Sequence, residues 1–170
     1  EDVEAALETL VKANPEAVML ACPYTPCAAF LKKARARGFS PLFLHLGVGT
    51  TALIHEAGKA ADGLIVTQIV PNPSDSALPI VKEFVSDMKA AGFTPDLVSL
   101  ESYLGAKVLV EASKKTSPLT REALISTLEK FSMEAGGLAV SFSPTDHQGL
   151  HQVFLTKIEN GKVVTIGNLK

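Results

Sequence analysis

The sequence predicts an α/β fold, in which helices flank a parallel β-sheet. Three short apolar runs, at residues 17–22, 41–45 and 63–70, have the length of buried strands. A helical pattern follows each of the first two runs, and strands that alternate with helices pair in parallel through right-handed crossovers. We therefore expect a Rossmann-like lobe of three layers, with helices on both faces of the sheet.

The region that organises this fold is 17–38, which predicts a strand, a loop and a helix in direct succession. The apolar run ends at Cys22, and the next four residues turn the chain. Thr25 and Pro26 suit the N-cap and first position of a helix, because proline gives up only an amide that a helix start leaves unpaired. In open α/β sheets, ligands bind at loops that follow the carboxyl ends of strands. We therefore expect a ligand contact in this loop.

The neighbouring segments continue the same alternation. A helix over 2–13, capped by Asp2, precedes the central unit. After the second strand, the Gly-Val-Gly turn at 47–49 leads into a helix over 50–57, which Gly58 ends. These elements make up half of a doubly wound sheet.

The same glycine turn resembles a dinucleotide-binding loop, with Ala52 in the third place of the pattern. Such a loop needs an acidic residue about 20 residues later, at the end of the next strand. Here that strand ends with Thr67, Gln68, Ile69 and Val70, so the acid is missing. The sequence therefore favours a tight loop whose amides face a smaller ligand.

The pattern changes at 71–73, after which three amphipathic helices follow. Their apolar stripes need a surface to cover, and residues 73–136 contain no evident sheet. Either the helices cross back onto the opening sheet, or their sheet lies in chain that is absent here. The residues expected to be buried are Leu78, Val81, Phe84, Val85 and Met88 in the first helix, Leu100, Leu104, Val108 and Leu109 in the second, and Leu124, Ile125, Leu128 and Phe131 in the third, which Thr120 caps.

Strand patterns return after the glycine pair at 136–137, over residues 138–142, 152–158 and 163–166. The Asn-Gly pair within 159–162 predicts a two-residue hairpin turn between the last two strands.

The composition is that of a globular protein, with 46% apolar and 20% charged residues in 170. The formal net charge of −2 gives no reason to expect nucleic acid or an anionic membrane as a partner. No apolar run is long enough to span a bilayer. Because the chain begins at Glu1 without methionine, we expect a mature form or part of a longer protein.

Two cysteines, Cys22 and Cys27, flank the expected ligand loop. A zinc site would need further ligands, and no matching pair lies nearby. A disulfide across the turn would form in an oxidising compartment. The sequence favours a third interpretation, in which both are buried free thiols.

No catalytic or metal site is predicted. His147 and His151 are four residues apart, but Gly149 lies between them in a region of strand and turn, so a turn is favoured over metal ligation. No serine has the surroundings of a nucleophile, and no Cys–His pair is evident. We therefore expect no catalytic residue, no metal and no cofactor.

Several segments carry a family resemblance through their order and spacing. They are residues 2–18, 30–38, 60–63, 79–84, 92–95, 102–106, 120–124, 141–149 and 160–162. Together they resemble the C-terminal portion of a type I periplasmic solute-binding protein, of the branched-chain amino acid (Leu/Ile/Val) receptor-like family of ABC transporters. The resemblance covers nearly the whole chain.

This resemblance implies two α/β lobes of the periplasmic-binding-protein type I fold, of which the chain is a fragment. Residues 1–72 and 137–170 would belong to the second lobe, and 73–136 would supply helices of the first. It implies a receptor in the periplasm, or on the extracytoplasmic face of a bacterial cell, that closes around a small molecule by hinge motion. The receptor would be peripheral to the membrane, pass its ligand to an ABC transporter permease, and catalyse nothing.

The resemblance also assigns ligand contacts. In members that bind amino acids, the loop after the strand at 18–22 supplies an aromatic contact, which Tyr24 matches. The loop after the next strand supplies a carboxylate for the ligand's ammonium, but residues 45–49 contain no acid. The resemblance leaves an amino acid-like ligand open, but an unpaired buried charge costs several kcal/mol. We therefore favour a carboxylate-bearing or aromatic ligand, held by amides at 47–49 and the Thr25 hydroxyl. The predicted ligand-binding residues are Tyr24, Thr25, His45, Leu46, Gly47 and Ser99.

Two alternatives remain open. A ligand-sensing domain of a membrane receptor or regulator would have the same fold, and a flanking transmembrane helix with a signalling module would favour it. A dinucleotide-dependent enzyme using the Gly47 loop is the less favoured alternative.

Overall fold

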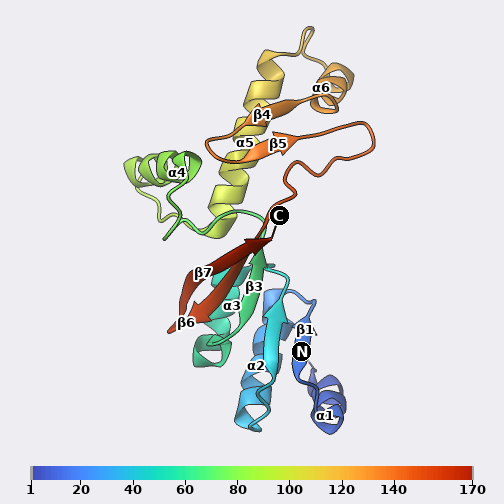
Figure 1. Cartoon of the computed structure of the whole chain (residues 1–170), viewed down its shortest axis with the longest axis vertical. Helices are drawn as coiled ribbons and strands as arrows, with labels where there is room; N and C mark the ends of the chain where they lie inside the picture. Colours follow the sequence, from blue (N-terminus) through green and yellow to red (C-terminus); the bar gives the residue numbers. More distant parts are fainter. Residues whose placement is uncertain (1, 170) are drawn as a thin grey trace. The chain divides into compact units, whose positions relative to one another are not determined.

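The computed structural model describes the backbone of residues 2–169 and the side chains of residues 2–167. The chain divides into two compact units, Glu1–Gln68 with Val153–Leu169, and Ile69–Gln152 (Figure 1). The sequence predicted boundaries between the two lobes at 72 and 137, and the assignment of these parts to lobes remains a prediction. The chain rejoins the first unit only at Val153, because residues 139–141 pair with residues 132–134 inside the second unit.

The first unit is a five-stranded sheet with the order β1-β2-β3-β6-β7. β1, β2 and β3 are parallel, and β6 and β7 are each antiparallel to their neighbours. This confirms the α/β class and the mostly parallel sheet. The elements are α1 (Glu4–Ala13), β1 (Ala17–Leu20), α2 (Tyr24–Ala36), β2 (Leu42–His45), α3 (Thr50–Ala57), the 3₁₀ turn η1 (Gly58–Ala61), β3 (Ile65–Gln68), β6 (Val153–Glu159) and β7 (Lys162–Leu169).

One face of this sheet carries the core. Alternate strand residues such as Phe43 and Val66 are buried there among residues of α1, α2 and α3, because successive side chains of a strand point to opposite faces. The other face carries Met19 and Leu42, which are 54% and 48% exposed. Within the described part of this unit, helices therefore cover one face of the sheet, as expected for half of a doubly wound sheet.

Two local predictions have clear outcomes. The hairpin between β6 and β7 turns through Asn160 and Gly161, which have φ angles of 52° and 73°, so the Asn-Gly prediction is confirmed. The predicted start of α2 is wrong, because the helix begins at Tyr24 with Pro23 as its N-cap. Pro26 is therefore the third residue of the helix. Its missing N–H costs nothing there, since the first amides of a helix have no intrahelical partner.

The second unit contains three helices and a two-stranded antiparallel sheet. Thr120 caps α6 by accepting a hydrogen bond of 3.2 Å from the Ala123 amide, as predicted. Leu109 and Ile125 are exposed rather than buried, and no residue of α6 is buried. β4 was not predicted, because three residues are too few to show a strand pattern. The elements are α4 (Pro79–Ala90), α5 (Leu97–Lys114), α6 (Arg121–Leu128), β4 (Ser132–Glu134) and β5 (Ala139–Ser141).

Among the described residues, every helix is too short or too polar to cross a membrane.

Candidate functional site

The candidate site lies at the carboxyl edge of the first unit's parallel strands. β1 is followed by the Tyr24 segment, defined as residues 21–25, and β2 by the Gly47 loop, defined as residues 46–49. Because β1 and β2 are parallel neighbours in register, with Leu20 opposite His45, both segments leave the sheet at the same edge. The fold thus brings together two loops that the sequence analysis singled out separately.

The two segments touch through Tyr24 and Gly49. Gly49 is the N-cap of α3 and has a φ angle of 70°, a conformation that favours glycine. A Cβ atom placed on it would lie 2.8 Å from Cδ1 of Tyr24. The tyrosine ring therefore packs directly on the Gly49 backbone, and only glycine leaves room for it.

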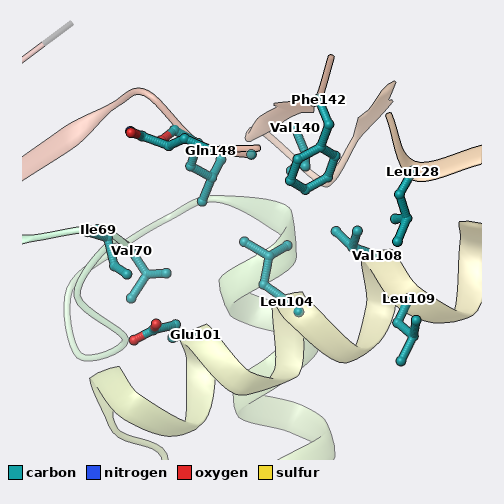
Figure 2. A pocket seen from close by; sticks show the side chains of 13 residues that line it. Ile69, Val70, Glu101, Leu104, Val108, Leu109, Leu128, Val140, Phe142 and Gln148 are labelled. Carbon is teal, nitrogen blue, oxygen red and sulfur yellow. The ribbon is translucent and has the colours of Figure 1, made fainter. Parts of the chain in front are cut away.

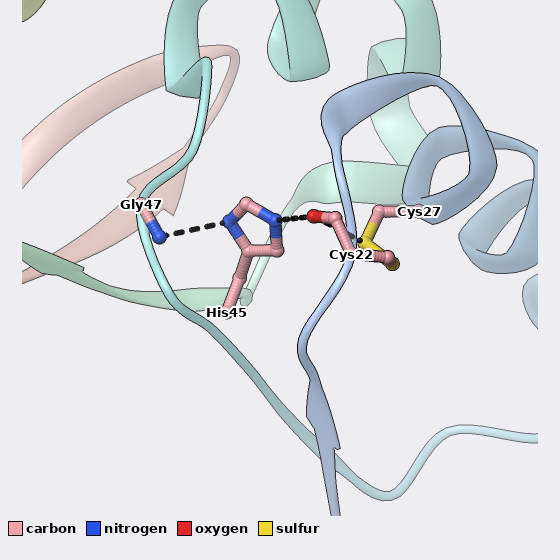
Figure 3. The surroundings of a disulfide bond; sticks show 4 residues. All are labelled: Cys22, Cys27, His45 and Gly47. Carbon is pink, nitrogen blue, oxygen red and sulfur yellow. Dashed lines mark hydrogen bonds between the residues drawn. A yellow bond between two sulfur atoms is a disulfide. The ribbon is translucent and has the colours of Figure 1, made fainter.

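A buried histidine connects the same two segments (Figure 3). His45 is fully buried at the end of β2. Its Nε2 lies 3.0 Å from the Cys22 carbonyl oxygen, and its Nδ1 accepts a hydrogen bond of 3.1 Å from the Gly47 amide. Burial lowers the pKa of the His45 imidazole, and the hydrogen bond to the Cys22 carbonyl opposes that effect. His45 therefore lies beneath the exposed surface of the two segments.

Cys22 and Cys27 form a disulfide, with their Cα atoms 6.0 Å apart. The favoured prediction of two free thiols is therefore wrong. The two cysteines are five residues apart, and the first turn of α2 brings Cys27 back over the end of β1. The bond closes a small ring around the Tyr24 segment, so that Tyr24 and Thr25 lie on a covalently closed turn.

The backbone of Gly47 is held by two hydrogen bonds and by close packing against β3. Its carbonyl oxygen accepts a hydrogen bond of 3.2 Å from the Thr50 hydroxyl, and its amide is used by His45. A Cβ atom at position 47 would lie 2.1 Å from the carbonyl oxygen of Thr67, at the end of β3. The Gly47 amide, an expected donor to the ligand, is thus already hydrogen-bonded to His45. The Val48 and Gly49 amides have no hydrogen-bond partner among the described residues.

A hydrogen-bonded network of buried polar side chains lies beneath the Gly47 loop. Gln68 donates from Nε2 to the Thr50 hydroxyl at 3.0 Å and to the Thr156 hydroxyl at 3.4 Å. Thr156 in turn donates to the carbonyl oxygen of Val66 at 3.0 Å. Buried networks of this kind give a structure rigidity when all members are satisfied, and in the described residues every buried side-chain nitrogen and oxygen has a partner. The sequence analysis missed this network.

The solvent side of the two segments is apolar and lacks acidic groups. Tyr24, Leu46 and Val48 are 37%, 50% and 56% exposed, and Thr25 is exposed beside them. No Asp or Glu occurs between residues 17 and 55, and neither α2 nor α3 has an acidic residue in its first turn. The partial positive charges of two helix N-termini are therefore not offset by nearby carboxylates.

Ser99, the remaining predicted contact, belongs to the second unit. It lies in the first turn of α5, where its amide donates to Asp96 Oδ1 at 2.8 Å and its hydroxyl accepts from the Asp96 amide at 3.0 Å. These bonds form a capping box at the start of α5. Its predicted role in ligand binding remains a prediction.

A separate apolar pocket of about 580 Å³ lies within the second unit (Figure 2). Leu104 and Val108 of α5 line one side, and Phe142 lies across from them. The polar side chains in its wall are Glu101 and Gln148. None of the predicted ligand-binding residues lines it, so this pocket is distinct from the edge described above.

The described residues contain no group of three or more potential metal ligands. His147 lies 3.4 Å from Glu129, and His151 lies 3.4 Å from Asp146. Both histidines are exposed, so each pairs separately with a carboxylate on the surface.

Comparisons with known proteins identify the family of the chain. A sequence profile described as periplasmic binding protein matches residues 1–162. Leu/Ile/Val-binding protein homolog 7 of Brucella abortus is 27% identical to the chain, in an alignment that covers 97% of the chain and 44% of the relative. The chain thus spans less than half the length of the curated relatives it matches.

Solved structures show the same fold. A possible leucine/isoleucine/valine-binding protein from Rhodopirellula baltica superposes with a TM-score of 0.89 at 29% identity, over 98% of this chain and 47% of that one. A substrate-binding periplasmic protein from Ralstonia solanacearum gives 0.83 at 29% identity, over 97% and 49%. A leucine-binding protein from Thermotoga maritima gives 0.85 at 21% identity, over 99% and 48%. With the profile match over residues 1–162, these likenesses show that the chain belongs to the periplasmic binding protein family, with the type I fold and its mostly parallel sheet.

Proposed function

We propose that this chain is part of an extracytoplasmic receptor for an ABC uptake transporter, and that it binds a small carboxylic acid with an apolar or aromatic body. The observation that carries this proposal is the contact between the Tyr24 segment and the Gly47 loop at the carboxyl edge of the sheet. Together they present exposed Tyr24, Leu46 and Val48, and neither segment contains an acidic residue.

The expected ligand class follows from charge. A solute with an ammonium group needs a carboxylate partner, because an unpaired charge in a closed site costs several kcal/mol. The Gly47 loop offers Leu46 and Val48 instead. A ligand carboxylate, by contrast, is favoured near the starts of α2 and α3, where the Thr25 hydroxyl and the amides of Val48 and Gly49 supply hydrogen-bond donors. The ring of Tyr24 offers a face for an aromatic body.

The biological setting is inferred from the family. Relatives carry names such as Leu/Ile/Val-binding protein, and one solved structure of the same fold is described as a branched-chain amino acid ABC transporter with bound valine. We propose that the receptor works in the periplasm or on the outer face of a bacterial cell, closes on its solute, and delivers it to a membrane permease without chemical change. A disulfide suits such an oxidising compartment.

We also propose that the first unit belongs to the second lobe of a two-lobed receptor, and that the helices of the second unit belong to its first lobe. Two observations support this division. The exposed Met19 and Leu42 leave one sheet face uncovered in the first unit, although parallel sheets are usually covered on both faces. The pocket beside α5, together with exposed Leu109 and Ile125, leaves an apolar surface in the second unit.

Isothermal titration of the full-length receptor tests the ligand class. The panel is benzoate, 4-hydroxybenzoate and phenylacetate against leucine and valine. We expect at least one aromatic acid to bind with micromolar affinity or better and both amino acids to bind far more weakly. Tight binding of leucine or valine would contradict the proposal.

A matched pair of variants locates the site. Val48→Ala shortens an exposed side chain of the Gly47 loop, and Val11→Ala shortens an exposed side chain of α1, which precedes β1 and lies at the opposite edge of the sheet. We expect Val48→Ala to weaken binding of the acid and Val11→Ala to leave it unchanged. Equal effects would place the acid elsewhere.

A further inference from the structure

We propose that His45 is a positioning residue for the solute site. In its neutral form, with the proton on Nε2, it holds the Tyr24 segment and the Gly47 loop at a fixed separation. This inference rests on the proposed function, because it names the residue that sets the geometry of that site. The His45 side chain is itself fully buried, so it acts on the solute through the two segments.

The two partners of the ring leave it a single protonation state. The Gly47 amide can only donate, and it lies 3.1 Å from Nδ1, so Nδ1 carries no proton. The Cys22 carbonyl oxygen can only accept, and it lies 3.0 Å from Nε2, so Nε2 carries the proton. In the other neutral tautomer, the Nδ1–H group would face the Gly47 N–H group, and the bare Nε2 would face the Cys22 carbonyl oxygen.

Both ends of this bridge are attached to segments that are otherwise held in place. Cys22 is bonded covalently to Cys27 in the first turn of α2, and Gly47 is held by Thr50. His45 is thus the buried side chain through which two locally rigid segments are hydrogen-bonded to each other. The two segments also meet where the Tyr24 ring packs on Gly49. A site whose parts are held in the bound geometry binds more tightly, because less order must be created on binding.

Two conservative substitutions separate the two hydrogen bonds. In His45→Asn, the side-chain oxygen occupies the place of Nδ1 and can still accept from the Gly47 amide, while the donor to Cys22 is lost. In His45→Gln, the longer side chain places its NH₂ group near the position of Nε2 and can still donate to the Cys22 carbonyl, while the acceptor for Gly47 is lost. His55 is exposed on α3, so His55→Asn and His55→Gln are matched controls.

Amide hydrogen exchange on the full-length receptor tests the bridge without any solute. The reporter for the Gly47 loop is the Gly47 amide, and the reporter for the Tyr24 segment is the Cys27 amide, which donates to the Pro23 carbonyl oxygen at 3.3 Å. We expect His45→Gln to speed exchange at Gly47 about tenfold with little change at Cys27, and His45→Asn to do the reverse. A ¹H–¹⁵N spectrum of the wild-type ring should show the proton on Nε2.

Calorimetry with benzoate tests the consequence for binding. We expect roughly tenfold weaker binding in each His45 variant and unchanged binding in each His55 variant. If benzoate does not bind the wild-type receptor, 4-hydroxybenzoate or phenylacetate replaces it as the probe. If none of the three acids binds, the proposed ligand class is wrong, while hydrogen exchange still tests whether His45 bridges the two segments. Equal exchange changes at both reporters in both variants, or a proton on Nδ1, would overturn the bridge. Altered exchange with unchanged benzoate affinity would overturn the positioning role.

Discussion

Tyr24 and Gly49 meet so closely that the ring of one occupies the space where the other would carry a side chain. The contact joins the first turn of α2 to the N-cap of α3, and it does so at the surface where we place the solute. It therefore gives a direct way to disturb the site.

Gly49→Ala should displace the Tyr24 ring and weaken solute binding about tenfold or more. A Cβ atom 2.8 Å from Cδ1 forces the ring to move, and the left-handed backbone adds about 1 kcal/mol of strain. Isothermal titration and thermal unfolding measure the two effects. Gly38→Ala is the control, because its φ of 72° is matched and no atom lies within 4 Å of its added Cβ. Equal losses of affinity in both variants would show that backbone strain, rather than the Tyr24 contact, is responsible.

Removing the disulfide should loosen the Tyr24 segment. For a loop this short, a cross-link contributes about 2 kcal/mol to the free energy of unfolding, so Cys22→Ser with Cys27→Ser should lower stability by about that amount. Chemical denaturation of the double variant, and of the wild type with and without a reductant, measures the loss. This expectation would be contradicted if the reductant left the stability of the wild type unchanged and the double variant were as stable as the wild type.

Stability should fall as the pH drops below about 6.5, the ordinary pKa of histidine, because of His45. Burial lowers the pKa of His45 in the folded protein, so the unfolded chain takes up a proton there that the folded chain does not. Its contribution is present above the unfolded pKa and is lost as the pH falls toward the folded pKa, with a slope of at most about 1.4 kcal/mol per pH unit.

Urea unfolding at pH 7.5 and pH 5.5 measures this dependence. The loss of stability between the two pH values should be smaller in His45→Gln than in the wild type, and unaffected by His55→Gln, since His55 is exposed. A pH dependence that survives in His45→Gln would assign it to other groups.

Gln68→Met should destabilise the fold by about 1–2 kcal/mol. The substitution keeps the size of the side chain but removes the Nε2 donor to Thr50 and Thr156, and buried groups that lose a partner carry a penalty of this order. Chemical denaturation measures it. Gln152→Met, at a partly exposed position outside this network, is the control and should change stability little; a matching loss there would remove the network as the cause.

Strand alternation and turn residues predicted much of the first unit from local pattern alone. The helix over 50–57 and the Asn160-Gly161 turn lie where the sequence placed them, because each depends on neighbours in the chain. The same alternation carried an unused signal: His45 is two residues after the buried Phe43, so the two side chains point to the same covered face.

Contacts between residues far apart in the sequence could not be predicted from local pattern. Gln68 and Thr156 are 88 residues apart, and only the antiparallel pairing of β3 with β6 makes them neighbours. The disulfide was misjudged for a related reason: its formation depends on how far α2 brings Cys27 back toward Cys22, and hence on where the helix begins. Exposure of Leu109 and Ile125 depends on what covers α5 and α6, which their own apolar spacing does not reveal.

The Gly47 loop keeps its shape through backbone atoms: its central glycine uses its amide and carbonyl inside the protein. Leu46 and Val48 flank that glycine with exposed side chains, and neither is needed to hold the turn. Because the proposed site includes these two side chains, we expect substitutions there to change which solute is preferred while the scaffold stays intact. The pair is therefore the natural starting point for engineering a receptor with a new specificity.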